Sequence, residues 1–129
     1  MKDIIMSIKN KPLFVGLEGA SVETVSKAER SLGVCFAKDY REYVCNMGVA
    51  SFQGHELTGL CKSARLDVVT VTMYERNINP TIPKDWYVIE QTNIDGIVIW
   101  QNELGEIYQT IPGLKPTKIC DSLIDYVNL

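Results

Sequence analysis

Several signals that would point to particular functions are missing from this 129-residue sequence. It has no basic excess: 13 Lys and Arg face 16 Asp and Glu, giving a net charge of −3 at pH 7. A nucleic-acid binder needs a positive face that displaces counterions from phosphates, so the charge argues against direct nucleic-acid binding. No apolar run approaches the roughly 20 residues that a membrane span requires. The first nine residues are interrupted by Asp3 and Lys9 and lack the apolar core of a signal peptide. We therefore expect no membrane contact and a cytoplasmic protein.

Metal-binding patterns are also scarce. The four cysteines, Cys35, Cys45, Cys61 and Cys120, form no C-x-x-C pair, and His55 is the single histidine. A structural zinc site needs paired cysteine or histidine ligands, which this spacing does not supply. We expect no metal site and four reduced thiols, packed mostly as small apolar groups in a reducing compartment.

Catalytic motifs are absent as well. Nucleophilic catalysis needs a nucleophile, a base and a group that orients the base, and no local signature places a cysteine beside His55. The sequence contains neither a GxxxxGK[ST] nor a GxGxxG run to cradle phosphates. We expect no enzyme, no catalytic residues and no cofactor. A small hydrolase or ligand-binding domain stays open as an alternative, and it would require a pocket with convergent polar groups.

The length and composition predict a single globular domain over residues 1–129. Apolar residues make up 46% of the chain and charged residues 22%, close to globular averages. Residues 1–20 are predicted to form a short helix followed by a linker, Asn10–Ala20, because Pro12, Gly16 and Gly19 interrupt regular structure.

Two helices are predicted next. Ser21 can cap the first, whose apolar stripe of Val22, Val25, Ala28 and Leu32 recurs at three- and four-residue spacing, and Gly33 ends it. The second begins near Lys38 and Asp39 and ends at Gly48. Its predicted buried face is Tyr40, Tyr43, Val44 and Met47.

The rest of the chain reads mostly as strands. A hairpin is predicted at Ala50–Phe52 and His55–Thr58, and three strands at Trp86–Gln91, Gly96–Gln101 and Glu106–Thr110. The segment after Asp67 is ambiguous, because its β-branched residues suit a strand as well as a helix. Asp121 or Ser122 is expected to cap a final helix whose Leu123, Ile124 and Val127 cover the sheet. The order predicts an α+β fold with a central, mainly antiparallel sheet flanked by helices.

The ordered set of motifs resembles the SUKH superfamily, which includes fungal cell-wall-assembly regulators of the Smi/Knr type and many bacterial immunity proteins. The segments that carry the resemblance are Val25–Gly33, Phe36–Val44, Met47–Gly48, Ser51–Leu60, Asp67–Val69 with Tyr74–Arg76, Pro83–Glu90 and Asp121–Val127. One departure is Ala37, where family members often have proline. The resemblance implies that Asp67–Asn77 is helical.

The resemblance also implies an activity. The family's motif residues shape the fold and carry no catalytic role; what the family suggests is binding of a partner protein. We expect an immunity protein (antitoxin) of a bacterial polymorphic toxin system, which binds and neutralises a cognate toxin stoichiometrically. The toxin is expected to be a nuclease with a basic cleft. The alternative is a regulatory interaction module that binds a cellular protein without a toxin partner.

The charge distribution suggests where such a partner binds. No basic residue lies between Asp85 and Leu114, whereas five acidic residues do. An acidic surface would attract a basic nuclease and compete with its substrate. We hypothesise a partner-binding face on the strand meander, with Trp100 as an aromatic anchor, although strand tryptophans usually bury most of their area. The alternative is a solvated sheet edge that lacks lysine. The proposed face consists of Glu90, Asp95, Trp100, Glu103 and Glu106.

Overall fold

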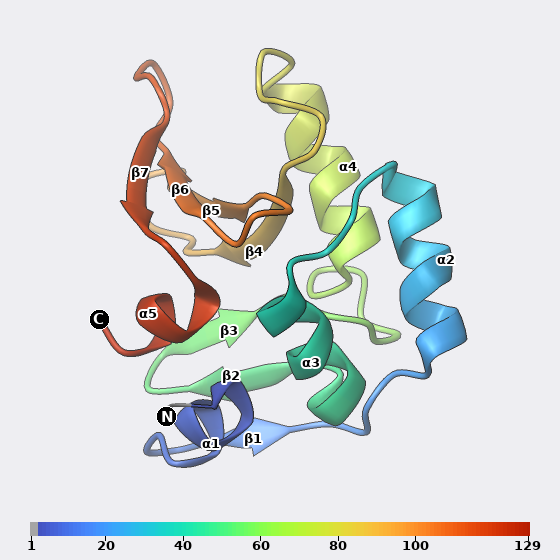
Figure 1. Ribbon diagram of the computed structural model, residues 1–129. Coiled ribbons are helices and arrows are strands. Elements are labelled where there is room, and N and C mark those ends of the chain that lie inside the picture. The colour runs from blue at the N-terminus through green and yellow to red at the C-terminus, as the bar shows by residue number, and fades with distance from the viewer. Residues whose placement is uncertain (1–2) are drawn as a thin grey trace.

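A computed structural model of the chain describes residues 3–129, which form seven strands and five helices (Figure 1). The strands make one antiparallel sheet in which each strand lies beside its neighbour in the sequence. The helices are α1 (Ile4–Lys9), α2 (Val22–Leu32), α3 (Lys38–Met47), α4 (Val68–Ile78) and α5 (Leu123–Val127). The strands are β1 (Val15–Gly16), β2 (Ala50–Phe52), β3 (His55–Leu57), β4 (Tyr87–Gln91), β5 (Val98–Gln101), β6 (Ile107–Thr110) and β7 (Thr117–Cys120). The predicted α+β class is confirmed.

The N-terminal region contains one element that the sequence did not predict. The Asp3 carboxylate accepts a hydrogen bond from the Ile5 amide and caps α1, as the expected short helix requires. The segment expected to be a linker, however, contains β1, in which Val15 pairs with Ser51 of β2. A two-residue edge strand is too short to show the alternation of apolar and polar residues that predicts a strand, so its sequence resembles that of a loop.

The predicted boundaries of α2 and α3 are confirmed. The Ser21 hydroxyl accepts from the Thr24 amide, and Gly33 ends α2 with φ of 69°, a left-handed conformation that glycine adopts without steric cost. Val22 was expected in the buried stripe but is 74% exposed, because contact with the core begins one turn later, at Val25. The predicted inner face of α3 is buried as expected, and it comprises Tyr40, Tyr43, Val44 and Met47.

The ambiguous segment after Asp67 is the helix α4, as the family resemblance implied. The Asp67 carboxylate accepts from the Thr70 amide, and Val68 and Val71 are buried. Burial of these valines outweighs their modest preference for strands. Ser122, and not Asp121, caps α5 by accepting from the Asp125 amide.

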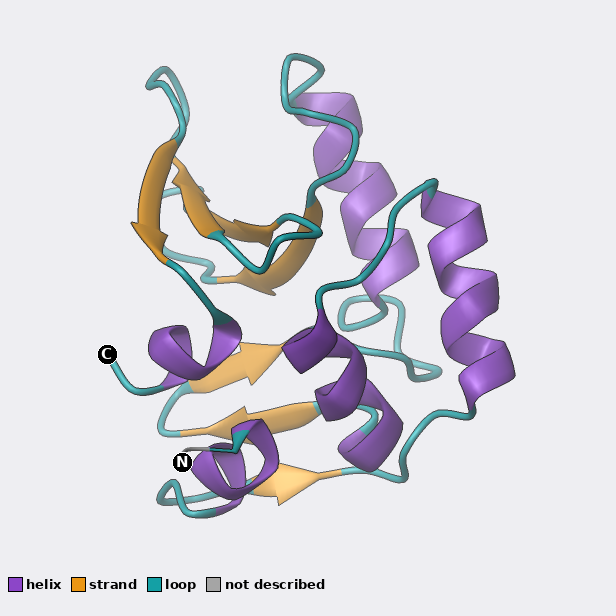
Figure 2. Cartoon of the chain, in the orientation of Figure 1, coloured by secondary structure: helices purple, strands orange, loops and turns teal. Residues whose placement is uncertain are grey.

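The sheet bends so that β4–β7 form a curved half, seen in the upper left of Figures 1 and 2, while β1–β3 lie flatter below. Register shifts between Val88 and Glu90 and between Ile107 and Tyr108 mark bulges that assist such bending. Both faces of β4 and β5 are covered. One side packs in the main core with α3 and α5; on the other, Val71 of α4 joins Ile82, Trp86, Val88, Val98 and Trp100.

The cysteines are less buried than expected. All four are free; Cys45 and Cys120 pack partly against the core, and Cys61 is half-buried. Cys35 is exposed, so the prediction of packed thiols is wrong there: it lies in the connection between α2 and α3, between the buried residues Val34 and Phe36. Within residues 3–129 no helix is long and apolar enough to cross a membrane.

Candidate functional site

A hollow rich in carboxylates lies where the beginnings of α1, α3 and α5 meet the turn between β5 and β6. We call it the acidic cleft. Its volume is about 500 Å³. Four carboxylates line it, together with the apolar side chains of Ile4, Leu104 and Ile124 and one cation, Lys38. The carboxylates are those of Asp3, Asp39, Glu42 and Asp121.

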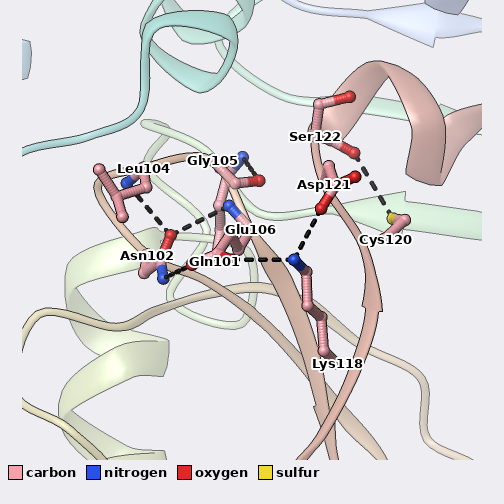
Figure 3. Close-up of polar contacts among 9 residues, drawn as sticks. All are labelled: Gln101, Asn102, Leu104, Gly105, Glu106, Lys118, Cys120, Asp121 and Ser122. Carbon is pink, nitrogen blue, oxygen red and sulfur yellow. Dashed lines mark hydrogen bonds and ion pairs between the residues drawn. The ribbon is translucent and has the colours of Figure 1, made fainter.

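The β5–β6 turn forms one wall of the cleft, and the amide side chain of Asn102 makes three hydrogen bonds within it. The Asn102 Oδ1 atom accepts from the amides of Leu104 at 3.1 Å and Glu106 at 3.0 Å. Its Nδ2 donates to Glu106 Oε1 at 2.9 Å, and these bonds close the turn (Figure 3). Gly105 adopts φ of 95°, which the turn requires. Leu104 is left 78% exposed on a turn whose backbone is fixed.

A buried hydrogen-bond network ties this turn to α3 and α5. Gln101 is fully buried, and its Nε2 donates to the carbonyl of Gly105 at 3.0 Å and to Asp39 Oδ1 at 3.1 Å. The other Asp39 oxygen accepts from the Leu123 amide at 2.7 Å, so an α3 side chain caps the first turn of α5. Tyr87 completes the chain: its hydroxyl donates to Gln101 Oε1 and accepts from the Ala37 amide, each at 2.8 Å. The walls are therefore fixed relative to one another.

One cation is shared at the edge of the cleft. Lys118 Nζ lies 2.9 Å from Glu106 Oε2 and 2.7 Å from Asp121 Oδ1 (Figure 3). The hydrogen bonds that Lys118 donates to Asp121 and Glu106 raise the pKa of its ammonium group. The bonds from Asn102 and then Lys118 hold the pKa of Glu106 below its usual value. Because one ammonium group pairs with two carboxylates, the net charge of this group of three side chains at the edge of the cleft is negative.

The site residues predicted from the sequence fall into separate places. Glu103 is exposed on the β5–β6 turn beside Leu104, and the half-buried Glu106 follows them. Asp95 is exposed in the β4–β5 turn, which lies at the opposite end of β5. Glu103 and Glu106 therefore share the β5–β6 turn region without lining the acidic cleft, and Asp95 lies away from them.

The other two predicted site residues lie inside the protein, which corrects the proposed face. Trp100 is fully buried, and its indole Nε1 donates to Thr110 Oγ1 at 2.9 Å. Glu90 is 3% exposed; its carboxylate accepts from the Glu56 amide at 3.0 Å and from the Tyr126 hydroxyl, and lies 3.1 Å from His55 Nδ1. Both lie on strands that are covered on two sides, so neither can anchor a partner in this conformation.

The sequence reasoning missed most of the acidic cleft. Asp3, Asp39 and Glu42 belong to a segment with a basic excess, and Asp121 to a segment whose charges cancel. The net charges of these sequence segments therefore gave no indication of the four carboxylates. Leu104 did leave a signal, because it lies in the turn predicted at Asn102–Gly105, and turns run over the protein surface.

The cleft is suited to binding a positively charged, partly apolar surface. Within residues 3–129, no group of three or more His, Cys, Asp and Glu side chains is arranged to hold a metal ion. His55 and Glu90 form the pair nearest to an acid–base arrangement, and Glu90 is used there to join β3, β4 and α5.

Comparison with known proteins identifies the family. Residues 1–127 match the family model SUKH_5, described as SMI1-KNR4 cell-wall. The chain matches none of the curated proteins with which it was compared. The match covers nearly the whole chain and agrees with the antiparallel α+β architecture. The protein therefore belongs to the SUKH superfamily, in its SMI1-KNR4 family.

Proposed function

We propose that the protein is an immunity protein, which binds a cognate protein toxin and neutralises it by forming a stoichiometric complex. Membership of the SUKH superfamily supports binding of a protein partner. The observation that carries the proposal is the acidic cleft, because it combines four carboxylates with a 78% exposed leucine on a rigid turn.

The chemistry of the cleft favours a basic toxin such as a nuclease. A nuclease needs a positive site for its phosphate substrate, and a carboxylate surface can speed the encounter and compete for that site. An exposed apolar residue among carboxylates, as Leu104 is in the cleft, can be desolvated by a partner and so serve as the anchor that tight interfaces use. Inhibition by occupancy needs no catalytic residue, and we place this activity in the bacterial cytoplasm, where the toxin would act.

The experiment is co-expression of the protein with the product of the adjacent toxin-like gene. Growth and co-purification are scored with and without the protein. We expect rescue of growth and a stable complex. Toxicity without rescue or complex would overturn the proposal for this toxin and favour the regulatory interaction module.

Matched variants test the site itself. Leu104→Asp and Glu42→Lys should each weaken the complex about 10- to 100-fold, the usual loss for a central interface residue. The controls are Leu13→Asp, at a residue 82% exposed elsewhere, and Glu23→Lys, at an exposed position of α2; both should leave the affinity unchanged. Equal affinity for Leu104→Asp and the wild-type protein would show that the toxin binds another face.

A further inference from the structure

A second hollow lies at the opposite end of β5, between the C-terminal half of α4 and the turns that join β4 to β5 and β6 to β7. We call it the α4 groove. Its volume is about 570 Å³. Tyr74 and Ile78 of α4 contribute to one wall, and Ile97 and Pro112 from the two turns contribute to the other. Glu75 and Gln91 also line it, and they place a carboxylate in a groove whose other lining residues are apolar or neutral and polar.

Glu75 is an unusual residue to find in such a place. It is 7% exposed, and Gln91 Nε2 donates to its Oε2 at 2.7 Å. In the chain from Asp3 to Leu129, no lysine, arginine or histidine forms an ion pair with it. The neighbouring Arg76 points elsewhere and donates to the carbonyls of Leu32 and Lys84.

The position of Glu75 on the helix adds to its electrostatic cost. It lies in the last turn of α4, where the helix macrodipole is negative and a carboxylate is disfavoured. Buried carboxylates are normally paired with a cation, because hydrogen bonds from neutral groups compensate lost hydration only in part. One neutral amide is a poor substitute for that cation.

Among the described residues, those that line the groove include no lysine, arginine or histidine. The segment from Asp85 to Leu114 contains no basic residue, and Asp95 adds a further carboxylate on the exposed β4–β5 turn. Tyr74 is 61% exposed and Ile78 57%, and they lie one turn apart on α4. An aromatic ring and an aliphatic side chain beside a buried carboxylate suit a planar guanidinium, which stacks on rings and pairs with carboxylates in bidentate fashion.

We propose that the α4 groove is a socket for an arginine side chain that a protein partner presents between apolar residues. In this complex the guanidinium pairs with Glu75, Gln91 holds the carboxylate in place, and Tyr74 and Ile78 cover the side-chain stem. The inference rests on the proposed function only in taking the partner to be a protein. The socket and the acidic cleft lie at opposite ends of β5, so each can be tested without the other.

The test uses the full chain, labelled with ¹⁵N, and the peptide acetyl-Ala-Leu-Arg-Leu-Ala-amide. The control peptide has citrulline in place of arginine, which keeps the shape and removes the charge. We expect the arginine peptide to shift the side-chain amide resonances of Gln91 and the backbone amides of Ile97 and Val98. The citrulline peptide should bind about tenfold more weakly, as expected for loss of one charge-assisted pair.

Variants connect the binding to the socket. Glu75→Gln should reduce binding of the arginine peptide to the level of the citrulline peptide, while Glu103→Gln, at the other end of β5, should change nothing. Tyr74→Ala, at an exposed residue, should weaken both peptides and provides a second test if Glu75→Gln does not fold. Equal binding of the two peptides, shifts confined to the acidic cleft, or full binding by Glu75→Gln would each overturn the socket. A failed toxin rescue would leave this result unaffected.

Discussion

Tyr126→Phe is the substitution that most directly tests how the last helix is attached to the sheet. The Tyr126 hydroxyl of α5 donates to the buried carboxylate of Glu90 on β4. The same carboxylate accepts from the Glu56 amide of β3, so it joins three elements. Burial, and next the nearby charge of Glu90, raise the pKa of Tyr126, which therefore keeps its proton and acts as the donor at neutral pH.

The expected loss can be worked from these contacts. The substitution removes one donor from a carboxylate that is 3% exposed and leaves the aromatic ring in place. Hydrogen bonds to charged groups contribute about 1.5–3 kcal/mol, and the carboxylate keeps its other partners. We expect the free energy of unfolding to fall by about 2 kcal/mol. Urea denaturation followed by tryptophan fluorescence measures it, with the slope of the transition unchanged.

Two comparisons decide whether the carboxylate is the cause. Tyr74→Phe, which removes a hydroxyl from a residue 61% exposed, should cost less than about 0.5 kcal/mol. In a double-mutant cycle, Tyr126→Phe should cost clearly less in a Glu90→Gln background than in the wild-type protein. A loss below about 0.5 kcal/mol for Tyr126→Phe, or the same loss in both backgrounds, would refute the reasoning.

Two further predictions concern stability. Burial is the largest cause of a raised pKa in four tyrosines, Tyr40, Tyr43, Tyr87 and Tyr126. The ordinary pKa of tyrosine is 10.0, so above pH 10 the folded protein keeps phenolic protons that the unfolded chain releases. The free energy of unfolding that these tyrosines contribute should therefore be fully present below pH 10. It should fall as the pH rises above 10, by up to about 1.4 kcal/mol per pH unit for each tyrosine. Urea denaturation between pH 8 and 11 measures this change, and a stability that does not vary with pH over that range would contradict the prediction. Gly59→Ala should prevent folding, because an added Cβ would lie 1.8 Å from the Gly48 carbonyl oxygen. At Gly33 an added Cβ meets open space, so Gly33→Ala should lower the free energy of unfolding by only about 1 kcal/mol, for its positive φ. Circular dichroism spectra and melting curves of the two variants separate these outcomes.

The elements that the sequence predicted well are those with local signals. Ser21, Asp67 and Ser122 each accept a hydrogen bond from an amide three residues on, as capping chemistry expects. The missed strands β1 and β7 lie at the two edges of the sheet. β7 is four residues long and its side chains are only partly covered, so no alternation of buried and exposed residues marks it.

The errors at the predicted site have a different origin. The acidic-face hypothesis treated the meander as a surface, yet all four residues of β5 are buried, as are four of the five residues of β4. A strand that is covered on both faces has no exposed side. Trp100 and Glu90 are therefore buried whichever face of the sheet they lie on. The continuous apolar runs Tyr87–Ile89 and Val98–Trp100 were the available signal. The acidic cleft itself unites segments from residue 3 to residue 121, and only the fold brings these together.

This arrangement separates the residues that hold the fold from those that can choose a partner. Asn102 and Gly105 fix the β5–β6 turn, whereas Glu103 and Leu104 between them are exposed. We expect substitutions of residues 103 and 104 to change stability by less than about 0.5 kcal/mol, the usual range at exposed positions. Asn102→Ala should cost about 1–3 kcal/mol, because it removes the acceptor of two turn amides.

A library randomised at residues 103 and 104, sorted separately for folding and for toxin binding, checks this expectation. Most variants in the library should fold, and few should still bind the toxin that the wild-type protein binds. A library in which loss of binding always accompanies loss of folding would show that the turn acts on the toxin only through stability. If the two properties separate, one rigid scaffold can acquire new partners by changes in two side chains, because β5 and its network to α3 and α5 do not depend on them.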